Sequence, residues 1–596
     1  MQYTYTATGQ RETVIDARGT TTWDYDERDR LLSRTDPDGR TISYTYDAAS
    51  NRTSVTVPSG TITYTFDTLN RLSTVTDPNL GVTRYTYNPV SNLIRTELPN
   101  GTVETRDYNS LNRLLFLENT GPGGVINSFR YTLDLVGNRI AVDEHDGRRV
   151  EYDYDDLYRL TEETITDSVN GNRTIVYVYD PVGNRRTRTD SVEGLTVYTY
   201  DTNDRLLTET LASKVTTYGY DNNGNTVSKI SDLDRVFYDW DFENRLISAD
   251  TNGDGTPDVV YQYDADGIRV SSTVAGEETR YLIDTVQPYQ QVIEEYTPGG
   301  VIKVSYVHGL DLISQLRDTS RSYYHVDGLG STRALTNAAG VVTDRYIYDA
   351  FGRTIGQVGS TGNVYLFAGE QRDSVTGLDY LRARLLSVGT GRFYGMDPFG
   401  GFHQRPLTLH RFLYGNVNPV NVVDPSGRIG SLEIPDPART WLDHIRRTQS
   451  DGTQVDLKAA RKEILELSFG RASAISGNEV DVSAIPDPDL ATGQPIICPG
   501  PLQNLQPFEL KMVLWGKGGI KQTTVIKGQL ADCLQPYSYG TFVQQVVTDF
   551  EANTKVSRNI FGLFKAGSGQ YTIRLGNFRH SENFKIDVQK YLHPSP

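Results

Sequence analysis

Residues 177–206 read YVYDPVGNRRTRTDSVEGLTVYTYDTNDRL, and this stretch decides the fold because it contains one sequence unit twice. Each copy has two aromatic residues two positions apart, then an Asp, then a short turn sequence. The Asp or Asn after the second aromatic residue recurs at positions 26, 47, 67, 88, 109, 134, 155, 180, 201, 221, 241 and 264. Spacings of 20 to 25 residues between these positions predict a repeat architecture.

Each unit predicts a β-hairpin. The Tyr-x-Tyr pair and the Thr and Val residues before it alternate as a strand requires, and Asp-x-x-Gly/Asn accepts turn geometry. Tyrosines two apart share one face of a strand, so neighbouring hairpins are expected to stack them, at about 0.2 to 1 kcal/mol per cross-strand pair. A single hairpin is marginal, so the array stabilises itself as a whole. The alternative is a tyrosine surface that stacks on sugars or bases.

The composition changes at residue 428. Residues 1–428 carry 41 Lys/Arg against 58 Asp/Glu, whereas residues 429–596 carry 18 against 17. Lysine occurs 3 times before this point and 10 times after it, and tyrosine 34 and 4 times. Two differently built modules are therefore expected. The net charge of -16 argues against nucleic acid binding by the whole chain, and residues 501–596, with 11 Lys/Arg against 6 Asp/Glu, form the one plausible basic face.

Targeting and redox signals are few. The opening MQYTYTATGQ lacks the charged and apolar regions of a signal peptide, and no apolar run of about 18 residues predicts a membrane span. The export route stays open. Cys498 and Cys533, the two cysteines, leave both a single bridge and free thiols open.

One insertion between repeats is acidic and rich in glycine. Its oxygen-bearing side chains Asp250, Asn252, Asp254 and Asp258 alternate around a Gly turn, as in the first part of a calcium loop. The glutamate that should close such a loop is missing. Calcium binding and a plain acidic hairpin tip are the two interpretations, and no other cofactor is expected.

The motifs after residue 305 carry a family resemblance. YYHVDGLGSTR, YDAFGR, TGLDYLRAR and two Asp-Pro-x-Gly elements, at Asp397–Gly400 and Asp424–Gly427, follow the Tyr-Asp repeats. Together they resemble the RHS/YD-repeat family with its RHS-repeat-associated core domain, which includes bacterial polymorphic toxins, the C subunits of insecticidal toxin complexes and teneurins. The resemblance covers residues 1–428.

The resemblance implies a mainly β fold. Residues 1–304 are expected to form a spiral β-shell of YD-repeat hairpins, residues 305–428 the core domain that closes it, and residues 429–596 a small α+β effector carried as cargo. It also implies a secreted or surface-delivered protein, an immunity protein, and a delivery partner. The shell is short for its cargo, so either the cage is partial or the reading frame lacks an N-terminal portion, as the decayed repeat at Tyr3 suggests.

In the toxin members of this family the core domain cuts its own chain. The resemblance assigns the catalytic roles to Asp397, Asp424 and Arg384 and the cut to the bond after Arg428. The chemistry is reasonable, because two adjacent carboxylates share a proton and so supply an acid and a base, while an arginine stabilises an oxyanion. The alternative is that both elements are ordinary turns. This chain departs from the family at Leu385–Val388, in place of Tyr-Tyr-Asp-Pro, and at Arg428, in place of leucine.

The tail reads as α+β. Helices are expected at 436–447, 455–469 and 540–552, a hairpin at 508–515 and 519–526, and strands at 571–576 and 584–591. His580-Ser-Glu582 has zinc-deaminase spacing, but the paired cysteines are missing, so that activity is excluded. A metal-independent ribonuclease would need acid–base groups near a cation, and His580, His593 and Lys585 or Arg579 supply them. Two functions follow: a self-cleaving toxin, or a non-enzymatic surface protein that binds glycans or cells.

Overall fold

The computed structural model describes residues 1–428 except 78, 80 and 402–405, and beyond residue 428 it describes strands alone, by their backbone. The chain divides into two compact units, Met1–Leu442 and Asp443–Pro596.

The first unit is dominated by one antiparallel sheet in which each strand from β1 to β34 pairs with the next along the chain. This confirms the predicted array of hairpins. The sheet runs without interruption across residue 305, so the change of motif there is not a break in the sheet. Its first strands are β1 Gln2–Tyr5, β2 Arg11–Asp16, β3 Gly19–Tyr25, β4 Leu31–Thr35, β5 Thr41–Tyr46, β6 Arg52–Val57, β7 Gly60–Phe66, β8 Leu72–Asp77, β9 Gly81–Tyr87, β10 Leu93–Glu97, β11 Val103–Tyr108, β12 Leu114–Gly121, β13 Gly124–Leu133, β14 Arg139–Glu144, β15 Arg149–Tyr154, β16 Leu160–Thr166 and β17 Arg173–Tyr179. It continues with β18 Arg185–Asp190, β19 Gly194–Tyr200, β20 Leu206–Leu211, β21 Lys214–Tyr220, β22 Thr226–Ile230, β23 Arg235–Trp240, β24 Leu246–Asp250, β25 Val259–Tyr263, β26 Arg269–Val274, β27 Glu277–Asp284, β28 Gln291–Tyr296, β29 Ile302–His308, β30 Leu312–Arg317, β31 Ser320–Val326, β32 Thr332–Thr336, β33 Val342–Tyr348 and β34 Thr354–Val358.

The repeated Asp closes the turn of each hairpin. Asp26 accepts hydrogen bonds at Oδ1 from the backbone N–H groups of Arg28 and Arg30, both at 2.9 Å. Asp29 adopts a φ of 57°, the left-handed conformation that Asp and Asn tolerate. The same pattern recurs at the later repeats, for example at Asp67 and Asp201. The motif is therefore conserved within the chain because the turn needs an acceptor and a left-handed residue.

Side-chain contacts of two kinds, which we call rungs, join each turn to the next: one is made by arginine and the other by asparagine. Arg30 lies over the ring of Tyr46 at 4.8 Å and donates to the carbonyl of Asp47 at 2.9 Å, both in the next repeat. In the next turn Asn51 occupies the place of Arg30 and donates to Asn70 Oδ1 at 3.0 Å. Arginine and asparagine alternate at this place along the array: Arg30, Asn51, Arg71, Asn92, Arg113, Asn138, Arg159, Asn184, Arg205, Asn225 and Arg245.

The first tyrosine of most pairs is part of the core. Tyr44, Tyr64, Tyr177 and Tyr198 are all buried, so their interpretation as packing residues is confirmed. The second tyrosine is half-buried, and its hydroxyl donates to a backbone carbonyl of the preceding repeat, as Tyr46 does to Leu31 at 2.8 Å.

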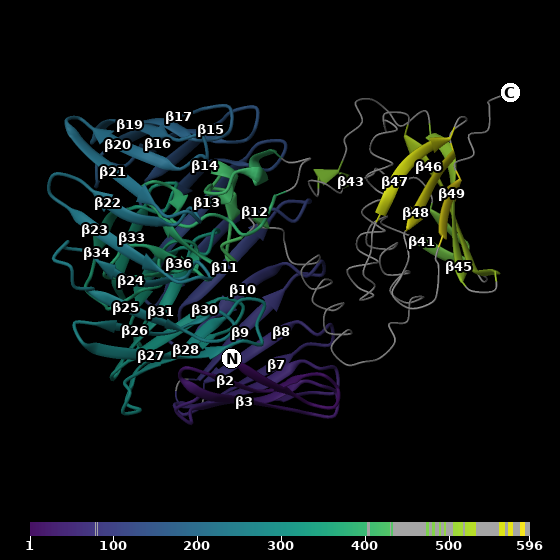
Figure 1. Ribbon diagram of the computed structural model, residues 1–596, viewed down its shortest axis with the longest axis horizontal. Coiled ribbons are helices and arrows are strands. Elements are labelled where there is room, and N and C mark those ends of the chain that lie inside the picture. Colours follow the sequence, from purple (N-terminus) through teal and green to yellow (C-terminus); the bar gives the residue numbers. More distant parts are fainter. Residues whose placement is uncertain are drawn as a thin grey trace. The chain divides into compact units, whose positions relative to one another are not determined.

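The sheet winds back on itself, so that residues about one turn of the spiral apart meet (Figure 1). Arg40 pairs with buried Glu294 at 2.7 Å, Arg52 pairs with Asp284, and Asn100 donates to Thr336 at 2.9 Å. An apolar cluster at this junction contains residues of β5 to β9 together with residues of β27 to β31.

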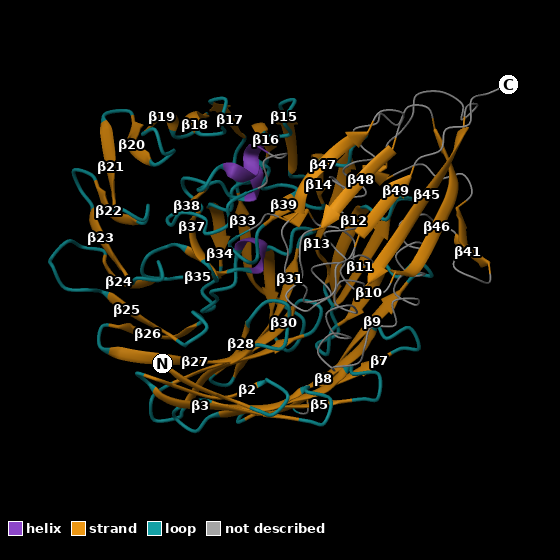
Figure 2. Cartoon of the chain, turned by 45° about the vertical axis from the view of Figure 1, so that its right-hand side comes forward, coloured by secondary structure: helices purple, strands orange, loops and turns teal. Residues whose placement is uncertain are grey.

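Residues 359–428 lie within the curve of the sheet (Figure 2). They form a small sheet of β35 Gln371–Arg372, β36 Asp379–Leu381, β37 Arg384–Ser387 and β38 Arg392–Phe393, the 3-10 helices η1 Phe367–Gly369, η2 Pro406–Leu409 and η3 Gly415–Val417, and β39 Val422–Val423, which pairs with β40 Ser431–Leu432. Side chains of the surrounding repeats form hydrogen bonds with this segment. Arg139 donates to the Val420 carbonyl at 3.0 Å, and Asn184 Oδ1 accepts from Arg392 at 2.9 Å and from His410 at 2.8 Å.

The second unit contains the predicted hairpin, as β45 Leu505–Gly516 and β46 Gly519–Ala531, and both predicted strands, as β48 Gln570–Leu575 and β49 Lys585–Gln589. Further strands are β41 Ala472–Ile475, β42 Glu479–Val482, β43 Pro488–Asp489, β44 Gln494–Pro495 and β47 Ile560–Ala566. The three predicted helices, Cys498 and Cys533 lie outside the described residues. None of the helices in the described part of the chain is long and apolar enough to cross a membrane.

Candidate functional site

The three residues proposed for self-cleavage meet at one place. Arg384 begins β37, directly after the two-residue turn that joins it to β36. Asp424 and Gly427 lie in the connection between β39 and β40. The Arg384 Nη2 atom is 2.9 Å from Asp397 Oδ2 and 3.1 Å from Asp424 Oδ2. One guanidinium therefore joins the carboxylates of both Asp-Pro-x-Gly elements.

Arg384 is held by further contacts. Its Nε donates to the carbonyl of Gly427, its Nη1 donates to the carbonyl of Arg411 at 3.1 Å, and its guanidinium lies 3.6 Å from the centre of the Phe393 ring. The side chain is almost completely buried. The leucines Leu385 and Leu386, where the family has tyrosines, pack into the core on either side of the strand and leave these contacts in place.

Burial shapes the charges of the site. It raises the pKa of Asp397, and Arg384 opposes that shift. It also lowers the pKa of Arg384, against the effect of its two carboxylate partners. A carboxyl whose pKa is raised is suited to hold and deliver a proton, and a buried guanidinium is suited to stabilise an oxyanion.

The peptide group between Gly427 and Arg428 is gripped at both ends. Its carbonyl accepts from Arg384, and its N–H donates to Asp424 Oδ1 at 3.0 Å. Gly427 has a φ of 65°, and a Cβ there would meet the Leu381 carbonyl and lie 2.9 Å from the Arg384 nitrogen. The bond predicted to be cut, after Arg428, is one residue further on, and its second residue lies outside the described residues.

The two Asp-Pro-x-Gly elements differ in geometry. Asp397 accepts from the backbone N–H of Phe399 at 2.8 Å, and its own backbone groups bond to Arg411. Gly400, unlike Gly427, does not have a positive φ, and a Cβ there would meet nothing within 4 Å. Only the second element thus has the glycine-dependent turn expected of both.

Two further residues join the site that the sequence did not indicate. Arg382 donates from Nη1 to both carboxylate oxygens of Glu370, at 3.0 and 2.9 Å, and to the carbonyl of Pro425. Arg382 stands two residues before Arg384 in the same motif, and this proximity could have pointed to it. Glu370 has no such signal, because its partner is twelve residues away on another element.

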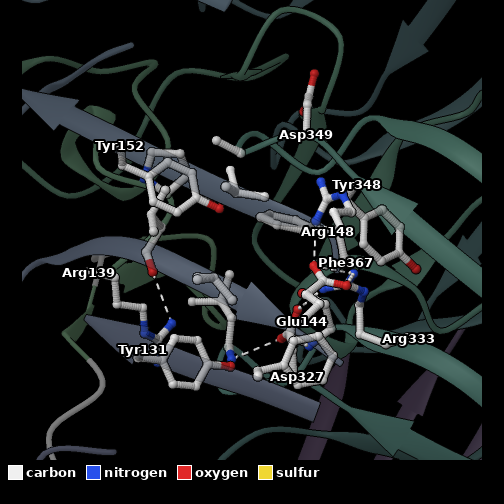
Figure 3. A pocket seen from close by; sticks show the side chains of 18 residues that line it. Tyr131, Arg139, Glu144, Arg148, Tyr152, Asp327, Arg333, Tyr348, Asp349 and Phe367 are labelled. Carbon is white, nitrogen blue, oxygen red and sulfur yellow. Dashed lines mark hydrogen bonds and ion pairs between the residues drawn. The ribbon is translucent and has the colours of Figure 1, made fainter. Parts of the chain in front are cut away.

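A polar cavity of about 60 Å³ lies where the repeats meet the core segment (Figure 3). Glu144 sits between Arg148 and Arg333, 2.9 Å from the latter, and Arg139 lines the other side. This volume suits one or two waters rather than a substrate. We assign the cavity a structural role, at the place where Arg139 anchors the segment that leads to Asp424.

The candidate calcium loop is organised by its own backbone. Asp250 accepts from the N–H groups of Gly253 at 2.6 Å and Gly255 at 2.8 Å, and Asp258 accepts from Thr251 at 2.7 Å. Asn252 donates to Asp258, and Asp254 accepts from Thr256. Among the described residues no group of three or more His, Cys, Asp or Glu side chains is arranged to hold a metal ion. Calcium binding by this loop stays a prediction that these contacts do not favour.

The candidate residues of the tail are not placed. His580, His593 and Arg579 lie outside the described residues, and Lys585 is the first residue of β49, described by its backbone alone.

Comparison with known proteins places the repeats. The family profile RHS Repeat matches residues 25–62, and the profile Teneurin YD-shell matches residues 137–420. The chain is 33% identical over 213 residues to the tRNA3(Ser)-specific nuclease WapA of Bacillus spizizenii, covering 35% of this chain and 9% of that protein. It is 29% identical over 225 residues to Salivary gland surface protein 1 of Aedes aegypti, covering 37% of this chain and 6% of that protein.

Among solved structures, the TcdB2–TccC3 complex has a TM-score of 0.59 at 18% identity, covering 72% of this chain and 25% of that one. At this identity the likeness concerns the fold. The chain spans about a tenth or less of the length of both curated relatives. The hairpin array, the paired Asp-Pro-x-Gly elements and both family profiles agree: the chain is a member of the RHS/YD-repeat family.

Proposed function

We propose that this chain is an RHS-type polymorphic toxin polypeptide whose core segment cuts the chain after Arg428 and frees residues 429–596 as an effector against competing or host cells. The observation that carries the proposal is the position of Arg384, which joins Asp397 to Asp424 and binds the carbonyl of Gly427 at the point where the composition changes. The effector as cargo, an immunity protein and a delivery partner belong to the same proposal.

The proposed reaction is hydrolysis. One carboxylate takes a proton from water, whose oxygen attacks the carbonyl carbon of Arg428, and Arg384 stabilises the oxyanion. The other carboxyl, which holds a proton at the start, gives that proton to the leaving nitrogen of Ile429 as the C–N bond breaks, and it regains a proton from the new carboxyl group of Arg428. We assign the acid to Asp397, whose pKa is raised by burial, and the base to Asp424. The products are a carboxylate on Arg428 and a new amino terminus.

The test is cleavage of the purified chain. Wild type should give two fragments, and Asp424→Asn and Arg384→Met should give one intact chain. Asp167→Asn is the matched control, because Asp167 is also a buried carboxylate that accepts from backbone N–H groups, far along the array. An uncut wild type sinks the proposal.

Sequencing of the amino terminus of the smaller fragment locates the cut. Ile429 as its first residue supports a cut after Arg428. Arg428 as its first residue would move the cut to the peptide group that Arg384 and Asp424 hold.

The activity of the tail is tested by growth. Induction of residues 429–596 in a bacterium should arrest growth, and His580→Ala with His593→Ala should relieve the arrest if the nuclease hypothesis is right. RNA and DNA from arrested cells then show which nucleic acid is cut. The nuclease hypothesis is in keeping with the name of the WapA relative.

The second candidate is a non-enzymatic surface protein that binds glycans or cells. It is favoured by the relative named a surface protein. An intact wild-type chain, unimpaired growth with the tail in several hosts, and binding of the chain to cells would support it over the toxin.

A further inference from the structure

A second arginine of the same hairpin holds the second Asp-Pro-x-Gly turn. Arg382 occupies the turn between β36 and β37 with a φ of 57°, a conformation that costs a non-glycine residue energy. Its Nη1 donates at once to the Glu370 carboxylate and to the carbonyl of Pro425. Its guanidinium lies 5.3 Å from the ring of Tyr289, in the loop between β27 and β28 of the large sheet.

The backbone beside Arg382 makes further contacts with the second Asp-Pro-x-Gly turn. Ala383 donates its N–H to the carbonyl of Ser426 at 3.3 Å, and Gly427 packs against Leu381 and Arg384 so closely that a side chain would not fit. Residues 381–384 thus contact residues 425–427 in succession. The hairpin that carries Arg384 therefore also fixes the turn on which Arg384 acts.

Glu370 is the anchor of this arrangement. It is buried, and it follows η1, an element separate from the hairpin and from the turn. Its carboxylate is the one anionic partner of Arg382 among the described ion pairs. Without it, Arg382 would be free to leave Pro425 for solvent, because its side chain is partly exposed.

We propose that Glu370 and Arg382 are positioning residues for self-cleavage: the ionised pair holds the Asp424–Gly427 turn against Arg384, and loss of the charge on Glu370 slows the cut. This inference rests on the proposed self-cleavage. Neither residue touches the reacting atoms in it, and both act through the turn.

The surroundings of Glu370 make its charge sensitive to pH. Arg382 faces it from the hairpin turn, Asp379 from β36 and Asp424 from the turn after β39, and Tyr365 and Tyr414 also lie near enough to interact electrostatically. Burial raises the pKa of Glu370 to about 7, with Arg382 opposing the shift and the two aspartates adding to it. Above pH 7 the carboxylate is ionised and the grip is complete, and below pH 7 the grip weakens.

The experiment follows cleavage of freshly synthesised full-length chain between pH 6 and pH 9. Wild type should slow as the pH falls through 7. Glu370→Gln should slow cleavage about tenfold or more at pH 8, since small misplacements in an active site have effects of that size, and should lose the step near pH 7. Arg382→Gln should behave alike, and Glu370→Asp should restore part of the rate and keep a step.

Glu294→Gln is the matched control. Glu294 is likewise a buried glutamate paired with an arginine, Arg40, but it lies at the junction of the spiral. The Glu294→Gln variant should be cleaved at the wild-type rate at every pH. Wild-type rate and pH profile in Glu370→Gln would overturn the inference while leaving self-cleavage intact.

A second readout separates the two proposals. If the wild-type chain is never cut, the proposed function fails, and amide hydrogen exchange in the same intact chains tests the positioning. The N–H groups of Gly427 and Arg428 both donate to Asp424, so they are protected while the turn is held. Their exchange should quicken about tenfold in Arg382→Gln and not in Glu294→Gln, and equal exchange in both variants would overturn the inference.

Discussion

The rungs between repeats can be tested at Arg71, which lies well inside the array. Its Nε donates to Asp67 at 2.7 Å within its own turn. Its Nη1 reaches the next turn, 3.4 Å from the carbonyl of Asn88 and 3.2 Å from the hydroxyl of Ser91, and its guanidinium lies 4.5 Å from the ring of Tyr87. Arg71→Ala removes all of these contacts and leaves both turns their backbone hydrogen bonds.

The cost follows from the exposure of the contacts. The ion pair is about one fifth exposed, so it contributes about 0.5 to 1 kcal/mol. The contact with the aromatic ring adds about 0.5 to 1 kcal/mol. The two long hydrogen bonds add about 0.5 kcal/mol together, at the low end of net values. We expect the free energy of local opening to fall by about 2 kcal/mol, which speeds amide exchange about 30-fold at 1.4 kcal/mol per factor of ten.

The assay is native-state hydrogen exchange of peptides that cover β8 and β9. The contacts that Arg71 loses lie within its own turn and the next one, so the effect should be largest in the two flanking hairpins. Arg84→Ala is the control, because Arg84 is an exposed residue of β9 whose side chain makes no hydrogen bond or ion pair with the described residues. Equal exchange in both variants, or a change spread evenly over the chain, would refute the reasoning.

Three further predictions concern the core segment and the array that surrounds it. Gly427→Ala should abolish self-cleavage, because its φ is 65° and a Cβ would collide with Leu381, whereas Gly400→Ala should cleave like wild type; cleavage of both would contradict this. Burial raises the pKa of Glu163 to about 8 from 4.5, so its contribution to stability is complete below about pH 4.5 and is lost as the pH rises through 8. The melting temperature of Glu163→Gln should therefore change less with pH than that of wild type between pH 6 and pH 9. The same change with pH in both proteins would contradict this prediction. His410 is neutral in the folded chain, with its pKa lowered to about 2 by burial and by Arg392, whereas in the unfolded chain it takes up a proton below its ordinary pKa of 6.5. His410→Leu should therefore cost about 1 to 2 kcal/mol at pH 8 through the lost contact with Asn184, and less at pH 5, where protonation of the unfolded wild type already lowers its stability. An equal cost at both pH values in thermal unfolding would contradict this.

The hairpin array could be predicted from sequence because its determinants are local. The Asp that closes each turn bonds to groups two and four residues away, and tyrosines two apart share a face, so both signals repeat within one unit. Predictions of the same kind also located the strands of the tail, such as β45 and β46.

The candidate site could be predicted only in part. Asp397, Asp424 and Arg384 belong to motifs with a family resemblance, and the structure brings them together. Glu370 could not be found, because its role depends on a contact with the turn of a separate hairpin, twelve residues further along the chain, and nothing in the local sequence marks it. Arg139 and Val420 meet for the same reason: 281 residues separate them, and only the winding of the sheet joins them.

The alternation of arginine and asparagine at the turns has a consequence for how such chains change in length. An arginine reaches the backbone of the following turn, as Arg30 does at Asp47, whereas an asparagine needs a polar side chain there, as Asn51 does at Asn70. A single hairpin gained or lost by recombination would set two turns of the same kind side by side. Two asparagine turns would then lose their contact wherever the following turn has glycine in place of the acceptor, as at Gly137, Gly183 and Gly224. The inheritable unit of this array is therefore a pair of hairpins, and genes of this type should lengthen and shorten in steps of two.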